Sequence, residues 1–144
     1  MIHLETAIEI DRPAAEVWTV FRDFASYQEW NPFIRELTGD VEQDGRLQIL
    51  LNQPGSKPMR FKPRVTELDE GRRLVWLGQF MVPKIFDGEH YFEVEPLGDD
   101  RCRFVQGERF AGVLVPFLRK MIDNQTRSGF EAMNQALKER AESR

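Results

Sequence analysis

The chain has 144 residues, of which 41% are hydrophobic and 31% are charged, and its formal net charge at pH 7 is −4. This length and composition fit a single globular domain, residues 1–144, that buries about two thirds of its unfolded surface. The small acidic surplus argues against a nucleic-acid partner, because such partners are bound through a basic surface.

A reducing compartment fits the cysteine content, since Cys102 is the only cysteine and an internal disulfide is excluded. The N-terminus has no basic segment followed by an apolar core, so no signal peptide is expected. The longest apolar stretch, residues 113–118, is too short to cross a bilayer. We therefore expect a cytoplasmic protein without membrane insertion. The oligomeric state stays open between monomer and homodimer.

The chain is expected to begin with a half-buried strand, because alternate residues from position 2 to position 10 are apolar. Asp11 is then predicted to cap a helix with a broad apolar side. Asp23 is predicted to cap a second short helix, which residues 30–32 (Trp-Asn-Pro) end. Two short helices are therefore expected between the first and second strands.

Six further short strands are predicted between residues 33 and 110, with turn signals between them. Pro63 lies inside one of these runs, which argues for an edge position or a bulge. A tight turn at Glu70-Gly71 joins this run to the next. The pairing expected around this turn is Val65 with Trp76, Pro63 with Gly78, and Phe61 with Phe80.

The last predicted hairpin joins residues 86–96 to residues 101–110 through a turn at residues 98–100. Its outer face pairs glutamates with arginines, as is typical of a solvated face. Its inner face carries His90 on the first strand, with Gln106 and Glu108 on the second. His90 should lie directly opposite Gln106 or Glu108, depending on a register choice of two residues.

A long helix is predicted from Val115 to about Glu142, since apolar side chains recur there at spacings of three, four and seven. The apolar stripe consists of Phe117, Leu118, Met121, Ile122, Phe130, Met133 and Leu137. Gln125, Thr126 and Gly129 interrupt it. Two interpretations fit: these residues border a void, or they tolerate close packing, with Gly129 letting a strand approach.

The element order, strand, two helices, six strands and long helix, predicts an α+β fold with antiparallel strands and segregated helices. The simplest arrangement is a curved sheet wrapped around the C-terminal helix, with the two short helices at one end. No repeat or interdomain linker divides the chain.

A resemblance to a known family is carried by three segments: IEIDRPAAEVWTVFRDFASYQEWNPFI (8–34), GEHYFEVEP (88–96) and GFEAMNQALKERAE (129–142). They resemble the SRPBCC superfamily and, more narrowly, its polyketide cyclase/dehydrase and lipid-transport branch. The resemblance covers essentially the whole chain. It implies a helix-grip, START-like architecture: a seven-stranded antiparallel sheet around the long C-terminal helix, enclosing a cavity for hydrophobic small molecules.

His90 and Glu108 are the candidate catalytic residues, because a histidine beside a buried carboxylate can exchange protons at neutral pH. Glu108, if desolvated, would have a raised pKa and could act as the acid. The alternative is structural: the two side chains hydrogen-bond each other or the backbone near the cavity mouth.

The candidate ligand-binding residues share the predicted concave face or the interrupted part of the helix. They are Met59, Phe61, Trp76, Phe80, His90, Phe92, Phe104, Gln106, Glu108, Gln125, Thr126 and Gly129. For the aromatic members the alternative is ordinary core packing, since pockets and cores use the same side chains.

No metal or cofactor is expected, because two histidines and one cysteine leave no zinc set and no Rieske ligands. No glycine-rich phosphate loop or nucleophile elbow occurs either. The favoured function is binding of a hydrophobic, lipid-like or polyketide-like small molecule. A cyclase, aromatase or dehydratase is the alternative, and a chaperone-associated interaction module is ranked third, because the outer faces look charged.

Overall fold

The computed structural model describes residues 1–80 and 84–144, without the side chain of Phe80, and within them it has eight strands. The strands are β1 Ile2–Ile10, β2 Ile34–Gly39, β3 Leu47–Leu51, β4 Met59–Phe61, β5 Arg64–Asp69, β6 Arg73–Phe80, β7 Phe86–Pro96 and β8 Cys102–Ala111. The helical elements are α1 Ala14–Arg22, η1 Phe24–Ser26, α2 Tyr27–Trp30, α3 Val115–Met121, η2 Ile122–Thr126 and α4 Arg127–Glu142.

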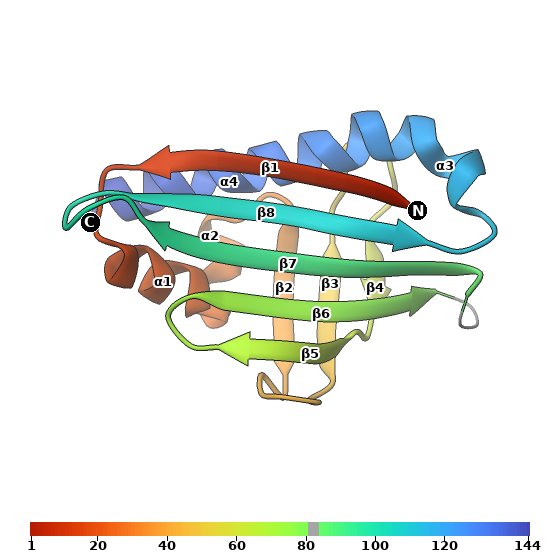
Figure 1. Cartoon of the computed structure of the whole chain (residues 1–144), viewed down its shortest axis with the longest axis horizontal. Helices are drawn as coiled ribbons and strands as arrows, with labels where there is room; N and C mark the ends of the chain where they lie inside the picture. The colour runs from red at the N-terminus through yellow and green to blue at the C-terminus, as the bar shows by residue number, and fades with distance from the viewer. Residues whose placement is uncertain (81–83) are drawn as a thin grey trace.

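The strands form two antiparallel sheets, one with the order β1-β8-β7-β6-β5 and one with the order β2-β3-β4. The strands of the smaller sheet run across those of the larger sheet, and α4 runs along the same side, next to β1 (Figure 1). The predicted α+β class and the long C-terminal helix are confirmed. The predicted single sheet of seven strands is wrong.

Pro63 is the reason for the extra strand. It separates β4, which pairs with β3, from β5, which pairs with β6. Proline has no N–H to give to a ladder, but its carbonyl oxygen accepts a hydrogen bond of 2.9 Å from the backbone N–H of Leu47. The chain thus leaves one sheet and enters the other at this residue.

The register predicted across the Glu70-Gly71 turn is right only near the turn. Val65 lies opposite Trp76, as expected. Phe61 lies opposite Ile49 of β3 instead of Phe80, because the chain has already crossed to the smaller sheet. The pairing of Pro63 with Gly78 is likewise absent from the described ladder between β5 and β6.

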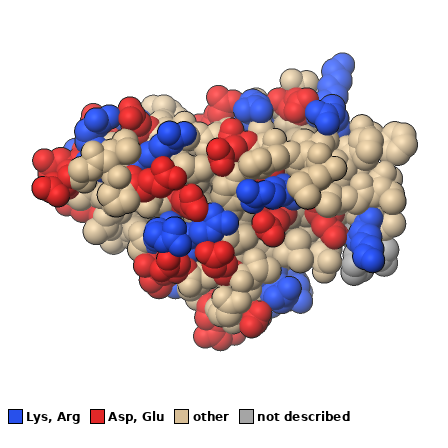
Figure 2. Space-filling model, viewed as in Figure 1, with Lys and Arg blue, Asp and Glu red and all other residues tan. Residues whose placement is uncertain are grey.

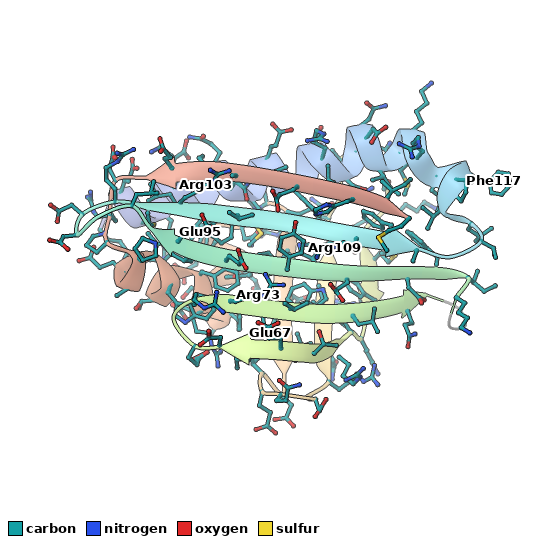
Figure 3. All side chains as sticks on the ribbon, viewed as in Figure 1. Glu67, Arg73, Glu95, Arg103, Arg109 and Phe117 are labelled. Atoms are coloured by element: carbon teal, nitrogen blue, oxygen red, sulfur yellow. The ribbon has the colours of Figure 1, made fainter. Side chains whose placement is uncertain are left out.

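The outer face of the large sheet carries charges of both signs, side by side (Figure 2). Arg73 forms ion pairs with Glu67, at 3.1 Å, and with Glu93, while Glu95 lies opposite Arg103. Glu67, Arg73, Glu95 and Arg103 lie on the viewer's side of the sheet, away from the core (Figure 3). On the last hairpin, Glu89 and Arg109 form an ion pair of 3.5 Å, which confirms the pairing of glutamates with arginines predicted for its outer face.

The two short N-terminal helices are present, but their predicted caps are wrong. Pro13 precedes α1 without a side-chain cap, and the Asp11 carboxylate lies 3.4 Å from the Arg101 guanidinium instead. Asp23 accepts a hydrogen bond from the Ser26 hydroxyl at 2.7 Å and caps no backbone N–H. At the end of α2, the side-chain oxygen of Asn31 accepts two backbone N–H groups and forms the corner.

The C-terminal helix is continuous from residue 115 to residue 142, but residues 122–126 form a π-helical segment. This irregular segment coincides with the predicted interruption at Gln125 and Thr126. Gly129 allows close packing, because a Cβ there would lie 2.5 Å from the ring of Phe33. Phe117 was expected in the buried stripe but is 82% exposed and projects from the end of the molecule (Figure 3).

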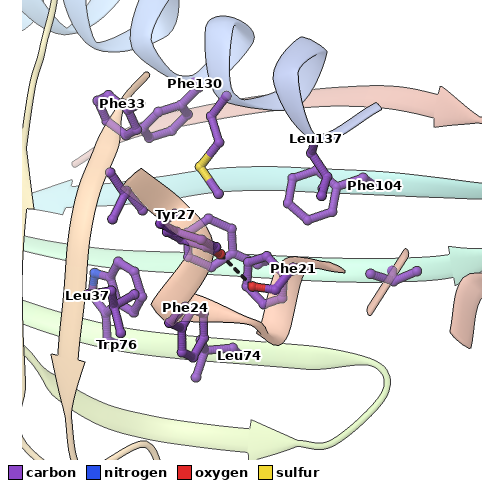
Figure 4. Packing of buried hydrophobic residues seen from close by; sticks show 14 of the residues in the cluster. Phe21, Phe24, Tyr27, Phe33, Leu37, Leu74, Trp76, Phe104, Phe130 and Leu137 are labelled. Atoms are coloured by element: carbon purple, nitrogen blue, oxygen red, sulfur yellow. Dashed lines mark hydrogen bonds between the residues drawn. The ribbon is translucent and has the colours of Figure 1, made fainter. Parts of the chain in front are cut away.

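The core lies between α4, the larger sheet and the short N-terminal helices (Figure 4). Phe21 of α1 contacts Phe92 of β7 and Phe104 of β8, with ring centroids 5.0 and 5.7 Å apart. The Tyr27 hydroxyl donates to the carbonyl oxygen of Phe21 at 2.6 Å, which ties α2 to α1. This end of the molecule is therefore packed, which leaves the other end for a cavity.

Candidate functional site

A cavity of about 180 Å³ lies between the smaller sheet, the far ends of β7 and β8, and the C-terminal helix. A single water molecule needs only about 10–15 Å³ of such space, so the cavity is open and large enough for a small ligand. Its lining consists of Phe33, Leu51, Gln53, Ser56, Lys57, Met59, Phe61, Phe86, His90, Glu108, Phe110, Met121 and Thr126.

The register of β7 and β8 brings His90 and Glu108 together in the cavity wall. The two residues lie directly opposite each other, and Nδ1 of His90 is 3.4 Å from Oε1 of Glu108. Nε2 of His90 is also 3.0 Å from the side-chain oxygen of Gln106, so the histidine contacts both residues considered for it. Both side chains of the pair are largely buried, 5% exposed for His90 and 13% for Glu108.

Gly88 makes room for the Glu108 carboxyl group. A Cβ at position 88 would lie 2.1 Å from Oε2 of Glu108, which no side chain could tolerate without displacing the carboxyl group. Since Gly88 is a neighbour of His90 on the same face of β7, it lets the carboxyl group lie over the strand. The local sequence Gly-x-His thus sets the geometry of the pair.

Burial sets the charge of both groups. Desolvation lowers the pKa of His90 from 6.5 to about 3, although its hydrogen bond with Gln106 acts in the opposite direction. Desolvation also raises the pKa of Glu108 from 4.5 to about 8. At neutral pH the imidazole is therefore neutral and the carboxyl group keeps its proton. The 3.4 Å contact joins a carboxylic acid to a neutral ring nitrogen.

Aromatic rings pack against the His90 imidazole on the side away from the cavity. It stacks on Phe92, with centroids 4.5 Å apart and planes inclined by 19°, and it also contacts Phe130 and Trp76. These rings separate the cavity from the core, and they exclude water from one side of the histidine. The environment explains why the neutral form of His90 is favoured.

Some of the residues that the sequence suggested for ligand binding line the cavity, and the others do not. Met59, Phe61, His90, Glu108 and Thr126 line the cavity. Gln106 lies behind His90, to which it is hydrogen-bonded.

Other suggested residues lie in the core or elsewhere. Trp76, Phe92 and Phe104 are packed in the core behind the histidine. The Gln125 side chain lies against the loop at Gly55 and Ser56, and Gly129 packs on Phe33. The side chain of Phe80 lies outside the described residues.

Several lining residues were missed by the sequence analysis. Phe86 and Phe110 share the inner face of the last hairpin with His90 and Glu108, so parity was a usable signal for them. Gln53, Ser56 and Lys57 belong to the loop between β3 and β4, where no periodicity indicates which side chains point inward. The oxygen of Gln53 accepts a hydrogen bond of 3.2 Å from Thr126, which brings the loop to the helix.

Residues 1–80 and 84–144 offer neither a metal site nor a membrane-spanning helix. They contain no group of three or more His, Cys, Asp or Glu side chains arranged to hold a metal ion. Among the helices of this part of the chain, none combines the length and the apolar character needed to span a membrane.

The sequence was compared with families and with curated proteins. A model of the family described as polyketide cyclase/dehydrase and lipid transport matches residues 1–142. No curated protein matches at a significant level.

Three solved structures illustrate the similarity of the fold. The aromatase/cyclase ZhuI from Streptomyces sp. R1128 superposes with a TM-score of 0.80 at 19% identity, over 99% of this chain and 94% of that one. A START superfamily protein from Mycobacterium smegmatis gives 0.75 at 21% identity, over 98% and 97%. Norcoclaurine synthase from Thalictrum flavum gives 0.74 at 14%, over 99% and 94%. At these identities the superpositions show a shared START-like fold only.

Proposed function

The chain belongs to the polyketide cyclase/dehydrase and lipid transport family, and from this we propose that it binds a hydrophobic small molecule in the cavity beside His90 and Glu108. The observation that carries the proposal is the lining of the cavity. Apolar and aromatic side chains supply most of the wall surface, and its polar groups come from six of the thirteen lining residues: Gln53, Ser56, Lys57, His90, Glu108 and Thr126. Sites for small organic molecules are built in this way.

The polar groups of the lining suggest what the ligand carries besides its apolar body. Gln53, Ser56 and Thr126 offer uncharged hydrogen-bonding groups, Lys57 offers a positively charged donor, and protonated Glu108 offers an O–H donor. A mainly apolar molecule with one or two oxygen atoms would satisfy them. Lipid-like and polyketide-like molecules both meet this description, and we propose this broad class as the ligand.

Replacing Met121 by tryptophan should weaken binding of 2-naphthol by at least about tenfold, or about 1.4 kcal/mol. Met121 lines the cavity, and the larger indole would occupy the space that the aromatic probe needs. The dissociation constant can be measured by titrating protein into the fluorescent probe.

The matched control is Phe117→Trp on the same helix. Phe117 is 82% exposed and is not among the lining residues, so its replacement should leave the affinity unchanged. Equal affinities for both variants and the parent protein would mean that 2-naphthol binds elsewhere, and the proposed cavity site would be wrong.

A second candidate function, proton-transfer catalysis of the cyclase or dehydratase type, is favoured by the contact between His90 and Glu108. A carboxyl group with a pKa of about 8 is poised to exchange protons near neutral pH. In its ionised form Glu108 would remove an α-proton from a carbonyl compound and leave an enolate. Once the carboxyl proton has been replaced by a deuteron from solvent D₂O, return of that deuteron to carbon would complete the exchange, with solvent as the only other reactant.

Exchange of the α-protons of 2-tetralone in D₂O, followed by proton NMR, tests this candidate. The proposal expects exchange above the buffer rate that increases with pH up to about 8 and is lost in Glu108→Gln. Binding of 2-naphthol by the same variant should be retained, because glutamine preserves the shape of the side chain. Exchange at the buffer rate in the parent protein would contradict the catalytic candidate and leave the binding proposal intact.

A further inference from the structure

A chain of hydrogen bonds runs from β1 through the core to the cavity. It joins Thr6 of β1, Asn134 of α4, Gln106 of β8 and His90 of β7. Nδ1 of His90 in turn lies 3.4 Å from the Glu108 carboxyl group. The four residues behind Glu108 are each at most 9% exposed. Buried polar groups of this kind cost stability unless each is satisfied, so the direction of every bond matters.

The donor and acceptor roles along this series of hydrogen bonds are determined at Thr6. The Thr6 hydroxyl donates its only proton to the carbonyl oxygen of Gln106, at 2.9 Å. It can therefore only accept from Asn134, whose side-chain nitrogen lies 2.8 Å away. This contact orients the Asn134 amide, because its nitrogen faces Thr6 and its oxygen must face the other way.

The orientation of Asn134 is passed on to Gln106. The Asn134 oxygen accepts a hydrogen bond of 2.8 Å from the side-chain nitrogen of Gln106, and the same nitrogen lies 3.4 Å from the carbonyl oxygen of Phe130. With its nitrogen placed between two acceptors, the Gln106 amide presents its oxygen to Nε2 of His90, at 3.0 Å. An amide oxygen has no proton to give, so Nε2 of His90 must carry the hydrogen.

We propose that Thr6, Asn134 and Gln106 are positioning residues that hold neutral His90 in the Nε2–H tautomer and direct the lone pair of Nδ1 at Glu108. The inner nitrogen of the imidazole is already protonated, and the outer one is an acceptor facing the carboxyl group. His90 therefore has no proton to give to the cavity. The one mobile proton of the pair belongs to Glu108.

The consequence for a ligand rests on the function proposed above, whereas the tautomer itself does not. Glu108 can share its proton with Nδ1 of His90 or with a ligand atom in the cavity. A ligand oxygen that accepts hydrogen bonds, such as a carbonyl oxygen, competes for that proton. The network thus favours carbonyl compounds over ligands that can only donate, and it makes Glu108 the group that touches the ligand.

Nitrogen-15 NMR of protein labelled at histidine tests the tautomer directly, in the absence of ligand. The chain has two histidines, His3 and His90, so the variant His3→Gln leaves the spectrum of His90 alone. Near neutral pH the two ring nitrogens should give the separate shifts of an N–H at Nε2 and a bare nitrogen at Nδ1. The opposite assignment, or a charged ring, would overturn the proposal whatever the protein binds.

The role of the remote residues is tested by Thr6→Val and Thr6→Ser in the His3→Gln background. Valine removes the acceptor that orients Asn134, so the side-chain amides of Asn134 and Gln106 can both rotate by half a turn. The chemical shift of Nδ1 of His90 should then move toward that of a protonated nitrogen. Serine keeps the hydroxyl and should reproduce the parent spectrum. An unchanged tautomer in Thr6→Val would show that Thr6 does not position His90.

Asn134→Leu provides a second route to the same answer if Thr6→Val does not fold. Leucine has a similar shape and no polar side-chain atoms, so the Gln106 amide nitrogen keeps only the 3.4 Å contact with the carbonyl oxygen of Phe130 while the core stays filled. The proposal expects a mixture of both His90 tautomers in this variant. A pure Nε2–H form would contradict it, because the relay through Asn134 would then be unnecessary.

Discussion

The free energy of unfolding should reach a plateau between pH 4.5 and pH 6.5 and fall on either side of it, because His90 and Glu108 titrate in opposite senses. His90 has a lowered pKa in the folded state, so its contribution is lost as the pH falls from 6.5 toward 3. Glu108 has a raised pKa, so its contribution is complete below 4.5 and is lost as the pH rises toward 8. Each limb should have a slope of up to about 1.4 kcal/mol per pH unit.

Urea unfolding at a series of pH values measures both limbs. Glu108→Gln mimics the protonated acid at every pH, so it should remove the loss of stability on the alkaline side and leave the acid side unchanged. His90→Gln should do the reverse, since an amide cannot become charged. Stability curves of the parent and both variants that run parallel across the whole range would show that neither group is buried in the state described here.

Replacing Phe92 by alanine should lower the free energy of unfolding by about 3–5 kcal/mol. The Phe92 ring is fully buried and contacts Phe21, Trp76 and Phe104, and its other face supports the His90 imidazole. The same change at Phe117 removes an equally large side chain that is 82% exposed, and it should alter stability by no more than about 0.5 kcal/mol. Urea or thermal unfolding of the two variants compares them.

This pair of variants also decides between two interpretations of the aromatic residues. A Phe92 ring that lined a ligand cavity would leave little void when truncated, and its loss would affect ligand affinity more than stability. A cost near that of Phe117→Ala would therefore contradict the assignment of Phe92 to the core. The structure predicts a large loss of stability for Phe92→Ala, and a His90 ring that is less tightly packed because its stacking partner is gone.

Local patterns in the sequence were sufficient to predict most of the fold. The alternation within residues 86–110 placed His90, Gln106 and Glu108 on one face, because the parity of a hairpin depends only on its own strands. The order of helices and strands indicated the α+β class, because each element could be recognised from its own residues. The family resemblance then implied a cavity on the side where these residues lie, and the structure has a cavity there.

The features that the sequence could not predict depend on contacts between distant segments. Pro63 was recognised as an interruption, but the pairing of Phe61 with β3 depends on where the smaller sheet lies. Trp76 and Phe92 face inward as expected, yet whether they meet a ligand or the core depends on the position of Phe21 in α1. Asn134 was missed as a buried polar residue because its partners come from β1 and β8.

Methionine methyl NMR with 2-naphthol tests the central claim, a hydrophobic ligand site in the cavity, most directly. Of the five methionines, Met59 and Met121 line the cavity, Met133 is buried in the core and Met1 is 85% exposed. Ring currents from a bound aromatic probe should shift the methyl signals of Met59 and Met121 and leave those of Met1 and Met133 nearly unchanged. Saturation of binding without any shift at Met59 and Met121 would contradict the proposed site.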